Sequence, residues 1–255
     1  MVQISAYKKK SIKSQFKKEA AGFTLIEILI VIVISSIILG AVFSVFSNQQ
    51  KSYIANDRLT EMQQNLRAAI IIMAAEIREA GCDPTGNANA GIVLATQGRL
   101  QITKDIAGHS VNPQESDGDT DDTNEDITFG FSSSVPYDSD ENGIADGGGA
   151  DWSTPGELGR NIGGGFQPIA ENIEAVEFNY ILSDDTNTTT PSSSQLNDIR
   201  AVQISILAKA SSPEQNFPLS NSTYTTASGT VWNRPNDNYR RRFVSVTIQC
   251  RNLGY

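Results

Sequence analysis

The sequence predicts an α+β fold in which one long N-terminal α-helix packs on a C-terminal antiparallel β-sheet. Three observations support this prediction: an apolar run at residues 23–46, a helical repeat of apolar residues that continues to about residue 80, and short strand-like runs after residue 91. No helical segments alternate with the later strands, which argues against a doubly wound parallel sheet.

The composition excludes several classes of protein. With 39% hydrophobic and 19% charged residues, the 255-residue chain can bury a core, so a wholly disordered protein is excluded. Two cysteines and one histidine are too few to build a zinc or redox-metal centre within one chain, although metals with oxygen ligands stay open. The net charge of -9 argues against a nucleic-acid binder with a broad basic surface.

Residues 1–22 form a basic leader that precedes an apolar helix. The leader holds six lysines and one acidic residue, so its removal takes the net charge from -9 to about -14. Residues 23–46 contain one ionisable side chain, Glu27, and as a helix they span roughly 36 Å, enough to cross a bilayer. The positive-inside rule predicts a cytoplasmic N-terminus and places the chain beyond about residue 50 outside the cytoplasm.

Two details separate this segment from a simple signal anchor. The small-residue junction that ends at Gly22 lies before the apolar run, so cleavage there would keep the hydrophobic helix. Glu27 lies in the first turns of that helix, where a lone carboxylate costs about 2 to 3 kcal/mol in hydrocarbon. We therefore expect Glu27 to be functional and to have a partner.

The run KKEAAGFTLIE, residues 17–27, resembles the class III signal of type IV pilins and type II secretion pseudopilins. The resemblance implies that a prepilin peptidase cuts between Gly22 and Phe23 on the cytoplasmic side and methylates the new amino group. It also implies that Glu27, fifth in the mature chain, pairs with the Phe23 amine of a neighbouring subunit when the helices pack in a fibre. The alternative is an uncleaved membrane anchor.

Residues 47–81 continue the helix as an amphipathic half. Apolar residues recur there at three- and four-residue spacing. They are Leu59, Met62, Leu66, Ile70, Met73, Ile77 and Ala80. The segment has no proline and ends near Gly81, with Pro84 shortly after, so we predict one helix from about 24 to 80. Its first half would face lipid or the fibre core, and its second half would pack on a globular domain.

Residues 82–255 are expected to form that β-rich globular domain, with long acidic loops. The predicted strands are Ile92–Ala95, Arg99–Thr103, Ile127–Phe131, Ile173–Leu182, Ile199–Ala208 and Phe243–Cys250. In the fourth strand, alternate side chains should lie on the same face of the sheet. The residues expected on one face are Glu174, Val176, Phe178, Tyr180 and Leu182.

Four later segments, at residues 76–82, 127–129, 167–180 and 240–243, resemble PilW-type minor pilins and their J-type pseudopilin relatives. The resemblance implies a non-enzymatic subunit that is anchored in the bacterial inner membrane, joins an extracellular type IV pilus at or near its tip, and contacts the major pilin and other minor pilins. It would prime assembly or mediate adhesion and motility. The alternatives are a minor pseudopilin of a periplasmic type II secretion pseudopilus, or a fixed single-pass protein with a calcium-binding adhesive ectodomain.

Residues 138–146 read D-x-D-x-N-G-x-x-D, a spacing typical of calcium loops. The expected ligands are Asp138, Asp140, Asn142, Asp146 and the backbone carbonyl of Ile144. The motif departs from an EF-hand because Gly149 occupies the position of the bidentate glutamate, so an ion would need Asp151 or water. The alternative is a solvated acidic turn.

The two cysteines, Cys82 and Cys250, are expected on the oxidising side of the membrane. A disulfide between them would join the last strand to the end of the long helix. The alternative is two buried free thiols.

The sequence contains no catalytic motif. The single histidine, His109, stands in a polar segment with no nucleophile motif beside it. The glycine runs at 147–149 and 163–165 do not follow a strand-to-helix phosphate pattern. We therefore expect no enzymatic activity.

Overall fold

The computed structural model describes residues 22–107, 115–132, 138–147, 149–214, 223–234 and 236–253. Leader residues 1–21 and His109 lie outside the described residues. The chain forms two compact units, residues 1–52 and 53–255, which we describe separately.

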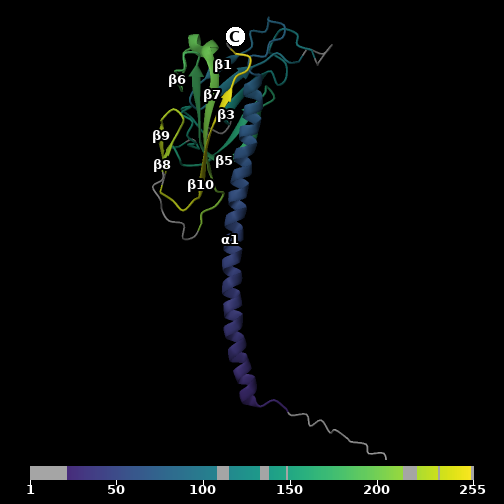
Figure 1. The fold of residues 1–255 in the computed structure, drawn as a ribbon, viewed down its shortest axis with the longest axis vertical. Coiled ribbons are helices and arrows are strands. Elements are labelled where there is room, and N and C mark those ends of the chain that lie inside the picture. Colours follow the sequence, from purple (N-terminus) through teal and green to yellow (C-terminus); the bar gives the residue numbers. More distant parts are fainter. Residues whose placement is uncertain are drawn as a thin grey trace, which may run out of the picture. The chain divides into compact units, whose positions relative to one another are not determined.

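Helix α1 (Leu25–Glu79) contributes its first half to the first unit and its second half to the second unit (Figure 1). It ends at Gly81, which takes a left-handed φ of +77° and donates its N–H to the carbonyl of Thr103 at 3.0 Å. A side chain at Gly81 would strike Leu253 near the C-terminus. The helix predicted for residues 24–80 is confirmed.

The second unit contains an antiparallel sheet with the strand order β1-β2-β3-β4-β5-β7-β10, in which β6 also pairs with β5, and a separate β8–β9 hairpin. The strands are β1 (Ile92–Ala95), β2 (Leu100–Thr103), β3 (Asp126–Phe131), β4 (Gly156–Asn161), β5 (Phe166–Leu182), β6 (Asn187–Thr188), β7 (Ile199–Lys209), β8 (Thr223–Thr225), β9 (Val231–Asn233) and β10 (Arg241–Gln249). A 3₁₀ helix, η1 (Ser193–Asp198), precedes β7.

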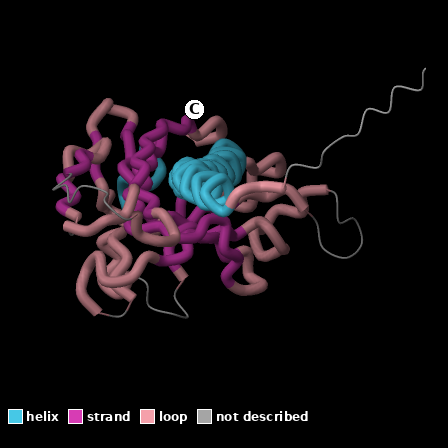
Figure 2. The backbone as a smooth tube through the Cα atoms, turned by 90° about the horizontal axis from the view of Figure 1, so that it is seen from below, coloured by secondary structure: helices cyan, strands magenta, loops and turns pink. Residues whose placement is uncertain are grey.

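The sheet curves around the second half of α1 (Figure 2), and the main core lies between them. The helix buries the apolar face that its repeat predicts, including Met62, Leu66, Met73 and Ile77. The facing sheet residues include Phe129, Val176, Phe178, Ile204 and Ile248. A smaller apolar cluster on the opposite face of β5 and β7 centres on Trp232 of the hairpin.

All six predicted strands are present, but four further strands, β4, β6, β8 and β9, were missed. Strand β4 has the sequence GELGRN, which lacks the apolar alternation of a half-buried strand. Its Gly159 is needed because the ring of Phe166 and the carbonyl of Gln167 occupy the space of a side chain. Strands β6, β8 and β9 have two or three residues each, too few for a periodic signal.

The face predicted for Glu174 is wrong because β5 contains a bulge. Its register with β7 shifts between Ile173 and Ala175, so Glu174 is the extra residue. Val176 and Phe178 lie in the main core as expected, whereas Glu174 pairs with cationic side chains.

Candidate functional site

The predicted processing and assembly residues lie at the start of α1. Every residue from Gly22 to Phe46 is exposed, and Phe23 and Leu25 expose 83% and 82% of their surface. In the described part of the chain, α1 is the one helix long and apolar enough to cross a membrane. An apolar helical surface of this size needs a cover, either lipid or other helices.

Glu27 has a partner within its own chain, which sequence reasoning missed. Its Oε2 accepts hydrogen bonds from the backbone N–H and the hydroxyl of Thr24, both at 3.0 Å. The Glu27 N–H donates to the Thr24 hydroxyl at 3.3 Å. This reciprocal pattern is a capping box, and the spacing T-x-x-E was its signal in the sequence. The pairing of Glu27 with a neighbouring Phe23 amine stays a prediction.

The structure brings the residues of the predicted calcium loop together, but they bond to one another. Asp138 Oδ2 accepts the N–H of Gly143 at 2.9 Å, and Asp146 Oδ2 accepts the N–H of Ser139 at 3.0 Å. Asn142 donates its amide to Asp140 at 3.0 Å and to Asp151 at 3.2 Å. In this arrangement, no three His, Cys, Asp or Glu side chains of the described residues are gathered as metal ligands. Calcium binding stays a prediction.

The glycine of this motif also has a structural role. The loop adds to β5, where the N–H of Ala145 donates to Glu174 O and the N–H of Val176 donates to Gly143 O, both at 2.8 Å. Gly143 takes a φ of +81°, and a side chain there would strike the carbonyl of Val176. Close packing on β5 therefore requires this glycine with or without an ion.

The environment of Asp138 disfavours its charge. Its Oδ1 is buried and, within the described ranges, has no hydrogen-bond partner. Burial and the neighbouring Asp140 raise the pKa of Asp138 to about 6, although the hydrogen bond from Gly143 opposes this shift.

We expect Asp138→Asn to stabilise the protein above pH 6 and to have little effect near pH 4. As the pH rises, the unfolded carboxyl ionises near its ordinary pKa of about 3.9, before the folded one, so wild-type stability falls between about pH 4 and about pH 6. Partial exposure screens the charge and limits the gain to about 1 kcal/mol. Thermal unfolding of the full chain in detergent across this pH range measures the effect.

The same melts in calcium and in chelator test the ion. A bound calcium would raise the melting temperature of the wild type more than that of Asp138→Asn. A wild type that neither responds to calcium nor takes it up in direct titration would identify the loop as an acidic turn.

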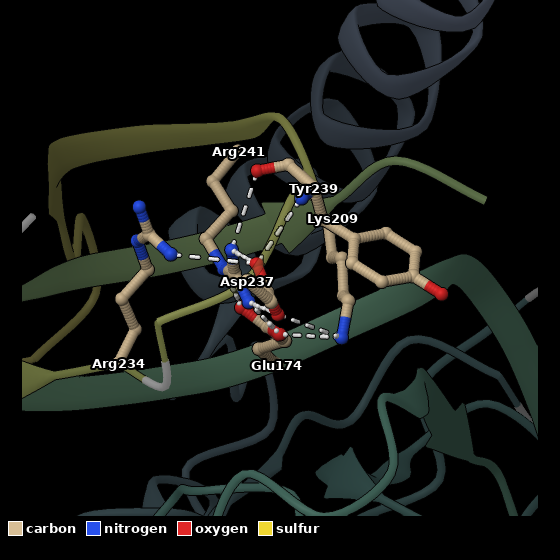
Figure 3. A network of polar contacts seen from close by, with 6 residues as sticks. All are labelled: Glu174, Lys209, Arg234, Asp237, Tyr239 and Arg241. Atoms are coloured by element: carbon tan, nitrogen blue, oxygen red, sulfur yellow. Dashed lines mark hydrogen bonds and ion pairs between the residues drawn. The ribbon is translucent and has the colours of Figure 1, made fainter. Parts of the chain in front are cut away.

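A buried network of charged side chains joins β10 to β5 and β7 (Figure 3). Arg241 makes a two-pronged contact with Glu174, in which its Nη2 lies 2.8 Å from Oε1, and both side chains are 1% exposed. Arg241 also binds Asp237 at 2.6 Å and 2.8 Å, and Lys209 lies 3.2 Å from Glu174 and over the ring of Tyr239. Burial alone would raise the pKa of Asp237, but the hydrogen bonds from Arg241 hold this pKa at about 2.

The three consecutive arginines at the start of β10 have different environments. Arg241 is buried in the network, and Arg240 pairs with Glu214 near the surface. Arg242 is exposed and forms no ion pair with any residue that the structure describes.

The predicted disulfide is absent, because Cys82 and Cys250 are both free thiols in the structure. Their backbones are held against different strands: the carbonyl of Cys82 accepts the N–H of Asp105 after β2, and the N–H of Cys250 donates to Arg200 in β7. The prediction relied on the cellular compartment and on chain position, neither of which supplies the Cα separation that a disulfide needs.

We expect the two thiols to react at very different rates. Cys82 is partly exposed, whereas burial raises the pKa of Cys250 to about 12 and keeps it protonated. At about pH 8 a thiol reagent should label one cysteine in the native chain and the second only after unfolding. Quantitative labelling followed by peptide mass spectrometry measures this, and a chain with no reactive thiol before reduction would contradict it.

Two family models match the chain. Residues 156–252 match Type IV Pilus-assembly protein W, or PilW, and residues 17–43 match the prokaryotic N-terminal methylation motif. The first match covers strands β4 to β10, including the arginine network, and the second covers the exposed start of α1.

A search of the curated proteins found no match. Among solved structures, the chain is similar to a type IV-like pilin, TTHA1219 from Thermus thermophilus, with 16% identity and a TM-score of 0.44. The similarity covers 75% of this chain and 96% of that one.

The methylation motif and the exposed apolar helix fit a protein that is anchored in the membrane before assembly. The chain is a type IV pilin-like protein, with an N-terminal methylation motif at residues 17–43 and a PilW region at residues 156–252.

Proposed function

We propose that the protein is a minor pilin, a structural subunit that enters a type IV pilus at or near its tip. Prepilin peptidase removes residues 1–22 and methylates Phe23, and the freed helix then exchanges lipid for the helices of neighbouring pilins. One observation carries the proposal: every residue from Phe23 to Phe46 is exposed, and residues 23–43 of this apolar surface lie within the methylation motif.

The proposal accounts for both halves of α1. The first half has no buried residue within the chain, so its apolar surface is available to lipid and then to other subunits. The second half buries its apolar face under the sheet, and it therefore anchors the globular domain to the fibre. This role is structural and requires no catalytic group.

Fractionation of cells that express the full chain tests this function. We expect the processed protein in fibres sheared from the cell surface, at low copy relative to the major pilin. A variant with a bulky residue at the cleavage site, Gly22→Leu, should stay in the inner membrane with its leader attached. Wild-type protein found only in a periplasmic pseudopilus would assign it to type II secretion, and unprocessed protein fixed in the membrane would overturn the proposal.

A further inference from the structure

Strand β10 is the last strand of the sheet, and one of its edges is open. Its nine residues pair with β7 in unbroken register, from Arg241 opposite Lys209 to Gln249 opposite Ala201. The bonds from Cys250 N–H to Arg200 O and from Ala210 N–H to Arg240 O show that the even-numbered residues of this strand direct their backbone groups toward β7.

The odd-numbered residues of β10 therefore direct their backbone N–H and C=O groups away from β7. These residues include Phe243, Ser245, Thr247 and Gln249. No other strand in the described part of the chain pairs with β10. The open edge thus offers a row of backbone donors and acceptors to another extended chain.

Beyond the exposed Arg242 at its start, this edge lacks the usual protection against strand addition. Residues 243–249, FVSVTIQ, contain no charged residue, proline or glycine. Proteins normally protect an exposed edge with charges, proline, bulges or a short strand. The other edge of the sheet follows that rule, because β1 has four residues and an irregular register. Of the two edges of the sheet, β10 is therefore the one more open to an added strand.

A groove of about 300 Å³ lies beside this edge, between β10 and the second half of α1. Its lining includes Leu66, Ile70, Ile71, Val244 and two arginines, Arg67 and Arg242. Ile71 is 57% exposed, so part of the apolar lining faces solvent. Alternate side chains of a strand added to β10 would point to the same side as Arg242 and Val244, and they would enter this groove.

The charge of the groove indicates what kind of segment fits. Neither Arg67 nor Arg242 forms an ion pair with the described residues, in a protein whose net charge is -9. An apolar side chain on the incoming strand would cover Ile70 and Ile71, and a nearby carboxylate would pair with an arginine.

We propose that β10 and this groove bind an extended segment of a neighbouring fibre subunit as an added strand, with an apolar residue in the groove and an Asp or Glu on the arginines. The inference rests on the proposed function, since the neighbour exists only within a fibre. A second copy of this chain is the less suitable partner, because processing leaves each copy with a charge of about -14 and copies repel one another.

Proline at an outward-facing position provides the test. Thr247→Pro removes an N–H that points away from β7, so the variant should melt like the wild type but fail to accept a strand. We expect its amount in sheared fibres to fall at least about tenfold. Arg242→Glu should have the same effect, because the new carboxylate would repel a carboxylate on the incoming strand. Arg78 is an exposed arginine in the last turn of α1, outside the groove, so the control variant Arg78→Glu should assemble normally.

Hydrogen exchange supplies the second measurement. The amides of residues 243–249 should exchange more slowly in fibres than in the detergent-solubilised full chain. If Thr247→Pro does not fold, Thr247→Lys, which keeps the backbone N–H but adds an edge charge, replaces it.

The outcomes separate this inference from the proposed function. Wild-type protein that never enters a fibre overturns the proposed function. If the wild type enters fibres and the Thr247→Pro and Arg242→Glu variants enter them equally well, only the strand addition is overturned. A cross-link between the β10 strands of two copies of this chain would contradict the choice of partner.

Discussion

Replacing Arg241 by methionine should destabilise the protein by about 3 to 5 kcal/mol. Among the described residues, the change leaves Lys209 as the one ionic partner of the buried Glu174 carboxylate, and it removes the main partner of Asp237. Breaking one side of a buried pair costs more than removing both, so the double variant Glu174→Met with Arg241→Met should recover part of the loss.

The adjacent arginines are matched controls for this experiment. Arg240→Met removes a partly exposed pair with Glu214 and should cost less than about 1 kcal/mol. Arg242→Met removes no described ion pair and should change stability still less. Denaturant unfolding of the full chain in detergent can be followed by tryptophan fluorescence, because Trp232 packs edge-to-face on Phe243 of β10. Equal effects of all three substitutions would contradict the role of the buried network.

Substitutions at Glu27 should strongly reduce assembly. We expect Glu27→Ala to leave membrane insertion and processing largely intact and to lower incorporation into fibres at least about tenfold. The reason is that a charged Phe23 amine of the neighbouring subunit loses its partner in an apolar surrounding. Quantitative immunoblots of membrane and sheared-fibre fractions measure both steps.

The capping box allows two roles of Glu27 to be separated. Glu27→Gln keeps the reciprocal bonds with Thr24 but removes the charge, whereas Thr24→Ala removes the hydroxyl but keeps the charge. If the charge acts between subunits, Glu27→Gln should assemble as poorly as Glu27→Ala, and Thr24→Ala should assemble well. If Thr24→Ala assembles poorly and Glu27→Gln assembles well, Glu27 acts by capping the helix. If all three variants assemble normally, Glu27 is not needed for assembly.

The long helix and six of the strands could be predicted because their signals are local and periodic. The apolar run after Gly22 and the three- and four-residue spacing from Leu59 to Ala80 specify one helix with two different halves. Strands β7 and β10 have the β-branched residues and the bounding loops that mark strands. The leader motif also lies within one short segment, and the cleavage after Gly22 that it implies stays a prediction.

Features that depend on contacts distant in the sequence could not be predicted. The bulge that turns Glu174 toward Arg241 follows from pairing of β5 with β7, and no alternation in β5 alone reveals it. A glycine at position 143 can be required by an ion-binding loop or by the close approach of the Val176 carbonyl. Only the fold shows the second reason. The free thiols were missed because a disulfide depends on distance, which compartment and spacing do not supply.

The N-terminus of the protein isolated from its own cells tests the central claim most directly. Intact mass and N-terminal sequencing of the membrane and fibre fractions should show a chain that begins at an N-methylated Phe23, with residues 1–22 removed. A chain that begins at Met1 in every fraction would contradict processing as a pilin and would leave a fixed single-pass membrane protein.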